Sequence, residues 1–89
     1  VLVTLLEEKT IDASVKLATA LRKSGIATEV YPALEKLGKQ FKYADQKGIP
    51  YVVIIGEDEL KADKVTLKDM KTGEQETFTS KELIRSIEI

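Results

Sequence analysis

The stretch "IPYVVIIG", residues 49–56, decides the fold because it is an apolar run that follows Gly48 and ends at Gly56. A short run rich in β-branched residues is typical of a strand that is buried on both faces of a parallel sheet. The opening residues 1–6, "VLVTLL", have the same character. We therefore predict two buried strands and expect the N-terminal one to lie at the centre of the sheet.

A first helix is predicted between these strands, at residues 11–24. Apolar residues recur there at helical spacing, Thr10 or Asp12 is available as the N-cap, and Gly25 can end the helix. The apolar positions are Ile11, Val15, Ala18 and Leu21. We expect this helix to cover one face of the sheet.

A further strand and a second helix fill the rest of that interval. Residues 26–31, "IATEVY", alternate in character and stop at Pro32, whose ring disfavours helical geometry at the preceding residue. We predict a strand near an edge of the sheet. An amphipathic helix then runs to Gly48, with apolar positions Leu34, Leu37, Phe41 and Ala44.

The C-terminal third predicts a hairpin and a last helix. Residues 65–70 and 74–79 alternate on either side of Gly73, which can adopt the positive φ of a hairpin turn. Thr79 and Glu82 match the capping box that opens many helices. Leu83, Ile84 and Ile87 continue this helix.

The order of elements predicts an α/β fold in one domain, residues 1–89. Right-handed crossovers make the first three strands parallel, and the hairpin reverses the fourth. If the second and third strands flank the first, the sheet order is 2-1-3-4-5. Ligands of such sheets bind beyond the carboxyl ends of the strands, here near residues 7–10 and 56–60.

Composition excludes several classes of function. The chain has no cysteine and no histidine, which rules out disulfides, thiolate metal sites and histidine-dependent nucleophilic catalysis. Its formal net charge of −1 argues against a surface that coats nucleic acid indiscriminately. No apolar run is long enough to span a membrane, and the start without Met suggests a domain of a longer protein. We expect an intracellular setting.

The second helix carries the first candidate site. On a helical wheel we assign one arc to its apolar residues and the opposite arc to Lys36, Lys39, Gln40, Tyr43 and Lys47. Such a face is either an ordinary solvated surface or an RNA contact. In the second case the lysines neutralise phosphates and the tyrosine ring stacks on an unpaired base.

The turn "GEDEL", residues 56–60, carries the second candidate site. Its carboxylates follow a buried strand and would lie near Glu7 and Glu8. A solvated loop, a Mg²⁺ site or a carboxylate that accepts the Watson–Crick edge of a guanine are the alternatives. A phospho-acceptor is rejected because no aspartate directly ends strand one or three.

On the fourth strand, Thr66, Lys68 and Met70 share a face, which exposes Lys68 on the sheet.

Two segments, "LEKLGKQFKYADQKGIPYVVIIGEDEL" at 34–60 and "VTLKDMKTGEQ" at 65–75, carry a family resemblance. Across essentially the whole chain, the sequence resembles the C-terminal anticodon-binding domain of class II aminoacyl-tRNA synthetases. Within that group it is most similar to the histidyl-tRNA synthetases. The resemblance implies a three-layer α/β/α fold with a five-stranded mixed sheet in the order 2-1-3-4-5 and strand four antiparallel.

The resemblance also implies roles for single residues. Glu59 stands where related threonyl-type domains have a base-reading acid, and Lys68 stands where they have an arginine. Leu34 replaces an asparagine of those domains, so that contact does not carry over. The residues implicated in RNA binding, from the helix face and from the resemblance, are Lys36, Lys39, Gln40, Tyr43, Glu59 and Lys68.

The partner implied by the resemblance is the anticodon stem-loop of histidine tRNA, with anticodon G-U-G. The resemblance implies a cytoplasmic, homodimeric parent enzyme whose separate catalytic domain would aminoacylate that tRNA with ATP and Mg²⁺. The anticodon-binding domain itself would bind no cofactor, no membrane and no DNA. It would have no catalytic activity alone. One alternative is a synthetase-like domain repurposed for protein–protein regulation. Another is a metal-dependent enzyme that uses Glu7, Glu8 and Asp58.

Overall fold

The computed structural model describes residues 1–87 and confirms the predicted α/β fold. A short 3₁₀ turn, Glu8–Thr10, precedes the first helix. The strands are β1 (Leu2–Val3), β2 (Glu29–Val30), β3 (Tyr51–Ile54), β4 (Val65–Asp69) and β5 (Gln75–Phe78). The helices are α1 (Ile11–Lys23), α2 (Leu37–Lys47), α3 (Glu57–Ala62) and α4 (Ser80–Ile87).

The five strands form one sheet in the predicted order β2-β1-β3-β4-β5. β1 pairs in parallel with β2 and β3, and β4 is antiparallel to both of its neighbours. The ladder of β1 is short, although the Thr4 N–H still donates to the Val53 carbonyl at 3.0 Å beyond it. β2 lies at an edge, as the sequence predicts. β1 is an interior strand between β2 and β3, but the middle strand of the sheet is β3.

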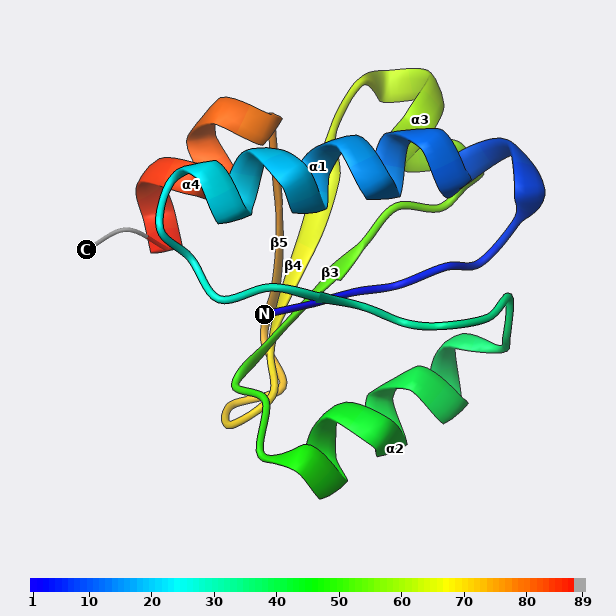
Figure 1. Cartoon of the computed structure of the whole chain (residues 1–89), viewed down its shortest axis with the longest axis vertical. Coiled ribbons are helices and arrows are strands. Elements are labelled where there is room, and N and C mark those ends of the chain that lie inside the picture. The colour runs from blue at the N-terminus through cyan, green and yellow to red at the C-terminus, as the bar shows by residue number, and fades with distance from the viewer. Residues whose placement is uncertain (88–89) are drawn as a thin grey trace.

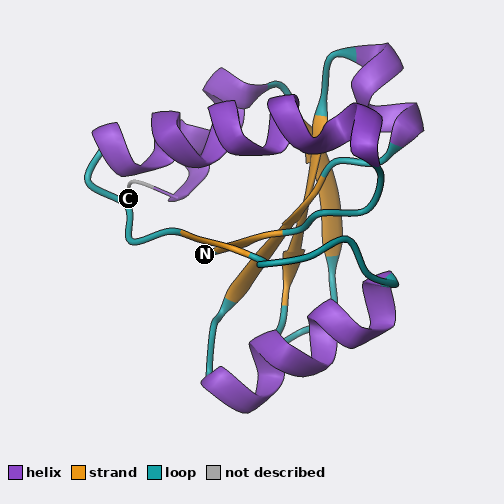
Figure 2. Cartoon of the chain, turned by 45° about the vertical axis from the view of Figure 1, so that its right-hand side comes forward, coloured by secondary structure: helices purple, strands orange, loops and turns teal. Residues whose placement is uncertain are grey.

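Helices cover the two faces of the sheet unequally. Figure 1 shows α1 and α4 on one side of the strands and α2 on the other. In Figure 2 the same three layers are seen from a second direction, with α2 as the single helix of its layer. A lone helix cannot cover all five strands, so part of the sheet stays open on the α2 side.

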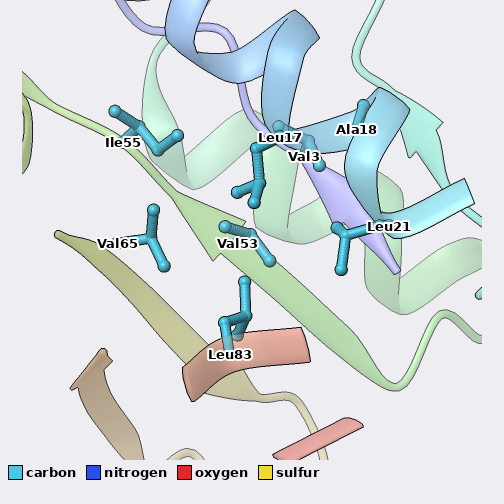
Figure 3. Packing of buried hydrophobic residues seen from close by; sticks show 8 residues of the cluster. All are labelled: Val3, Leu17, Ala18, Leu21, Val53, Ile55, Val65 and Leu83. Carbon is cyan, nitrogen blue, oxygen red and sulfur yellow. The ribbon is translucent and has the colours of Figure 1, made fainter. Parts of the chain in front are cut away.

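Each face of the sheet has its own apolar core. The larger core lies under α1 and α4 and is drawn in Figure 3; its buried members are Val3, Leu17, Ala18, Leu21, Val53, Ile55, Val65 and Leu83. The smaller core lies under α2 and contains Leu2, Ala44, Val52 and Ile54. Neighbouring residues of β1 and of β3 thus point to opposite cores, as the two-residue period of a strand requires.

The residue pattern of the first two helices differs from the prediction in two places. On α1, Ser14 is buried and Val15 is 46% exposed, because the stripe that meets the sheet runs through Leu17 and Leu21. Leu34 is 43% exposed and precedes α2, which begins at Leu37. The assignments of Val15 and Leu34 to the apolar faces were therefore wrong.

The ends of the elements follow their sequence signals more closely. The Thr79 N–H donates to Glu82 Oε1 at 2.8 Å and the Glu82 N–H donates to Thr79 Oγ1 at 3.2 Å, which confirms the capping box. Gly73 has φ +80° in the hairpin turn. Thr10 occupies the N-cap position of α1, but its hydroxyl donates to the Glu7 carbonyl instead of capping the helix.

None of the helices within residues 1–87 combines the length and the apolar character needed to cross a lipid bilayer.

Two glycines of α2 offer a matched test of this fold. Gly48 ends the helix with φ +69°, whereas Gly38 lies inside its first turn, and a Cβ at either position would meet no atom within 4 Å. We expect Gly48→Ala to destabilise the domain by about 1 kcal/mol, because alanine resists positive φ. Gly38→Ala should stabilise it by about 0.5–1 kcal/mol through helix propensity. Urea unfolding of both variants measures the difference, and equal effects would contradict the assigned backbone geometry.

Candidate nucleic-acid interface

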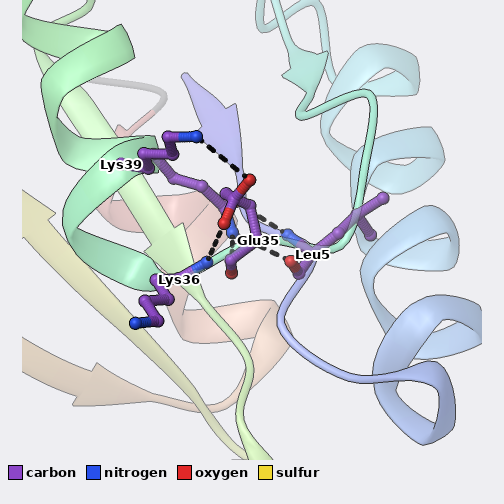
Figure 4. Close-up of polar contacts among 5 residues, drawn as sticks. Leu5, Glu35, Lys36 and Lys39 are labelled. Carbon is purple, nitrogen blue, oxygen red and sulfur yellow. Dashed lines mark hydrogen bonds and ion pairs between the residues drawn. The ribbon is translucent and has the colours of Figure 1, made fainter.

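The start of α2 presents two lysines around one carboxylate. The Lys36 N–H donates to Glu35 Oε1 at 3.1 Å, and Lys39 Nζ lies 3.5 Å from Glu35 Oε2. Figure 4 shows these side chains beside Leu5. The backbone hydrogen bond from Lys36 and the charge of Lys39 lower the pKa of the Glu35 carboxyl. Lys39 keeps 68% of its side chain exposed, so its ammonium remains accessible to a phosphate.

Gln40 does not lie on the exposed face of α2. Its side chain is fully buried, with Oε1 accepting from the Leu5 N–H at 2.9 Å and Nε2 donating to the carbonyls of Leu5 at 2.8 Å and Glu35 at 2.9 Å. The placement of Gln40 on the solvated arc was wrong, because Gln40 stands one turn before the buried Ala44. In this conformation its amide is occupied by the backbone and does not face solvent.

Tyr43 also departs from the predicted exposed face, because it is only partly exposed and packs against the smaller core. Its ring meets that of Tyr31 edge-to-face at 5.4 Å between centroids, and Lys47 Nζ lies 5.8 Å from the ring centre. Its hydroxyl donates to the Glu29 carboxylate, and this hydrogen bond raises the pKa of Tyr43. The assignment of Tyr43 to a solvated face opposite the apolar residues was therefore wrong, and its ring belongs to a cluster at the β2 edge.

Lys68 lies on the predicted face of β4 and projects toward α2, but it is only partly exposed because Phe41 covers it, so the prediction of an exposed lysine was only partly correct. Its Nζ lies 3.9 Å from the centroid of the Phe41 ring, which is a cation–π contact. Phe41 and Tyr43 are two residues apart on the helix and so point about 200° apart. Lys68 and Tyr43 consequently lie on opposite flanks of α2.

Glu59 lies on α3, where the sequence predicted a turn. The acidic run begins a helix because Gly56 is extended and Glu59 Oε1 accepts from the Gly56 N–H at 2.8 Å. Three acidic side chains in the first turn also favour helix through the macrodipole. Glu59 lines a cavity of about 260 Å³ between α1, α3 and β4, to which none of the other five candidate residues contributes.

The carboxylates near the end of β1 are already paired with a lysine. Lys9 Nζ lies 2.9 Å from Glu57 Oε1 and 3.9 Å from Glu7 Oε2. The hydrogen bond to Lys9 lowers the pKa of Glu57 and raises that of Lys9. Within residues 1–87 no group of three or more metal-binding side chains is suitably placed to hold an ion.

The structure therefore divides the six candidates instead of gathering them into one pocket. Lys36 and Lys39 lie together at the start of α2, and Lys68 approaches the same helix from β4. Glu59 lies at the carboxyl edge of the sheet. Sequence reasoning missed Phe41 and Glu35 as partners, although the four-residue spacing of Glu35 and Lys39 is a readable signal.

A five-stranded mixed sheet in this order, with α2 alone on one face, defines a class of α/β domain found in aminoacyl-tRNA synthetases. The family model described as "Anticodon binding domain" matches residues 1–88. The chain belongs to this family of anticodon-binding domains.

Among the curated proteins that the chain matches are histidine–tRNA ligases. The chain is 48% identical over 87 residues to the ligase of Wolinella succinogenes and 49% identical over 78 residues to that of Clostridium tetani. These matches cover 98% and 88% of this chain but 20% and 18% of the two ligases, respectively, so the chain spans about a fifth of their length.

Solved structures give the same result at the level of the fold. Histidyl-tRNA synthetase from Nostoc sp. PCC 7120 superposes with a TM-score of 0.92 at 35% identity, over 97% of this chain and 21% of that one. The RNA-binding domain of threonyl-tRNA synthetase from Cryptosporidium parvum superposes with a TM-score of 0.89 at 26% identity, over 96% and 22% respectively. The predicted resemblance to synthetase anticodon-binding domains is confirmed.

The ion pair of Lys9 and Glu57 can be tested by titration. Because Lys9 favours the charged form of Glu57, Lys9→Met should move the Glu57 pKa upward toward its ordinary value. The carboxyl resonance of Glu57, followed by NMR against pH, measures this shift. The pair stabilises the folded state above the unfolded pKa of Glu57 and loses its effect as the pH falls through the lowered folded pKa, so the variant should lose less stability on acidification. An unchanged Glu57 titration would show that the pair does not form in solution.

Proposed function

We propose that this domain binds the anticodon stem-loop of histidine tRNA and recognises the anticodon G-U-G. The observation that carries the proposal is the open part of the sheet beside α2, where Gln75 and Thr77 of β5 are exposed and Lys68 lies over Phe41. An unpaired loop needs such a surface, because its bases are splayed and its phosphates require cations. The histidine–tRNA ligase relatives support the choice of tRNA.

In this proposal the lysines bind phosphates and Glu59 binds a base. Lys36 and Lys39 neutralise backbone phosphates from the start of α2, and Lys68 adds a cation above the sheet. Glu59 accepts hydrogen bonds from the Watson–Crick edge of a guanine. One of its oxygens already accepts from Gly56, but a carboxylate has about four lone-pair positions and can accept further donors.

We further propose that this domain belongs to a longer chain, because it spans about a fifth of the length of its histidine–tRNA ligase relatives. A domain of this size would hold the anticodon end of the tRNA while a catalytic domain, supplied by the remaining chain, uses ATP and Mg²⁺ to aminoacylate the other end. We propose a cytoplasmic homodimer for the parent protein and no catalytic activity for this domain alone. Assay of the parent and of the isolated domain for ATP-dependent histidylation of tRNA tests the division, and histidylation by the isolated domain would contradict it.

Binding of stem-loop RNAs tests the central proposal directly. A G-U-G stem-loop should bind more tightly than an otherwise identical stem-loop with a changed anticodon. Equal affinity for both RNAs, or no affinity for either, would favour a domain repurposed for protein contacts. Fluorescence anisotropy at fixed salt measures both affinities.

Glu59→Gln separates the proposed base contact from the helix cap. Glutamine keeps an oxygen for the Gly56 N–H, but it replaces the second carboxylate oxygen with an amide donor. We expect the preference for G-U-G to fall by about 1–3 kcal/mol while stability changes little. Asp58→Asn, at the exposed neighbouring position, is the matched control and should keep the preference. A preference retained in Glu59→Gln would remove this residue from base recognition.

Lys39→Ala should weaken all stem-loops by a similar factor, because phosphates carry no sequence information. The slope of log K against log salt should become shallower by about 0.7–1 for the loss of one phosphate contact. Lys23→Ala removes the same charge from the end of α1, on the other side of the sheet, and should leave the slope unchanged. Equal slopes for the two variants would show that Lys39 does not contact the RNA.

A further inference from the structure

Gln40 is a buried polar side chain whose hydrogen bonds all go to backbone groups. These groups belong to two segments that are far apart from each other in the sequence. The Gln40 amide forms hydrogen bonds with both the N–H and the carbonyl of Leu5, which follows β1 in the chain. It also donates to the carbonyl of Glu35, which precedes α2. The Glu35 N–H adds a weaker bond to the Leu5 carbonyl at 3.3 Å. The amide therefore ties the carboxyl end of β1 to the first turn of α2.

Both parts of the proposed RNA site adjoin the segments that Gln40 connects. On one side Glu35 is followed directly by Lys36, and its carboxylate holds Lys39. On the other side, Leu5 is followed by Leu6, and Leu6 lies close to Gly56: its Cδ1 would be 3.8 Å from a Cβ placed there. The Gly56 N–H in turn donates to the Glu59 carboxylate.

We infer that Gln40 is a positioning residue that sets the distance between the phosphate-binding lysines of α2 and the carboxylate of Glu59. Hydrogen bonds are directional, so three of them fix the orientation of the helix start in a way that an apolar side chain of similar size does not. Gln40 thereby acts on anticodon preference without touching RNA. This inference rests on the proposed function of the same site.

A merely structural role predicts something different. Loss of packing alone lowers the folded fraction, which weakens every RNA by the same factor and leaves the ratio of affinities unchanged. Loss of positioning lets the lysines bind phosphates in several registers, so that a bound loop no longer presents its guanine to Glu59. The ratio of affinities for two stem-loops distinguishes these roles.

The test compares Gln40→Met with the wild type and with Ile84→Ala in the full chain. Methionine keeps the length of the side chain and removes its hydrogen bonds, while Ile84 is partly buried against the other face of the sheet and serves as a control for destabilisation. Affinities for the G-U-G stem-loop and a changed stem-loop are measured well below each melting temperature. We expect Gln40→Met to lose roughly tenfold in preference, the size of one base contact, and Ile84→Ala to keep it.

A double variant adds a second readout. If Gln40 places Lys39, then Lys39→Ala should cost less affinity for the G-U-G stem-loop in the Gln40→Met background than in the wild type. If the affinity losses of the two single variants add in the double variant, or if Gln40→Met keeps the preference for G-U-G, the inference about Gln40 is overturned. The proposed function still stands in that case, provided that the wild type shows the preference. A wild type without any preference would instead overturn the proposed function itself, and the inference with it.

A measurement on the wild type avoids any difficulty with the folding of Gln40→Met. The side-chain NH₂ resonances of Gln40 should shift on saturation with the G-U-G stem-loop and shift less with the changed stem-loop, because only the first draws the lysines and Glu59 into one arrangement. Equal shifts, or no shift, would contradict positioning by Gln40.

Discussion

The structure depends on the parallel pairing of β1 with β3 at the centre of the sheet. Leu2 and Val3 pair with Val52 and Val53, and within each strand the two side chains enter opposite cores. Four side chains thus anchor helices on both faces, although the ladder of β1 is only two residues long. A polar replacement in either strand would face one of the two cores and would cost the burial free energy of a core residue.

The unequal covering of the sheet follows from this arrangement and produces the open surface. The larger core needs two helices, α1 and α4, whereas the smaller core is covered by α2 alone. The strands farthest from α2 therefore expose polar side chains on that side, and Lys68 reaches back to the Phe41 ring. The α2 side of the sheet is therefore apolar beneath the helix and polar beyond it.

Much of the fold could be predicted from the sequence because local signals and hydrophobic period agreed. The runs at 1–6 and 49–56, the capping box at Thr79 and the glycine at the end of α2 all marked their elements correctly. Residues 57–62 were not recognised as helix, because the cap depends on the Glu59 side chain returning to a glycine N–H, and that signal resembles an acidic turn.

The candidate site was less predictable because its geometry depends on contacts between distant segments. The sequence suggests that Gln40 is a polar surface residue. Its amide is buried because it forms hydrogen bonds with the N–H and the carbonyl of Leu5, which lies beyond the β1 ladder. The cluster of Tyr43 with Tyr31 and Glu29 joins residues from a helix and an edge strand. Amphipathic spacing reports which side of a helix is apolar on average, but it does not report which polar side chain will complete another segment's hydrogen bonds.

The two edges of the sheet have a consequence for how copies of the domain behave at high concentration. β2 provides an outer ladder of two residues, and β5 at the opposite edge carries Glu76 between exposed polar neighbours. Short edges and charged edges both discourage a foreign strand from adding to a sheet. The domain can thus keep a polar sheet surface open to solvent without offering a template for edge-to-edge aggregation.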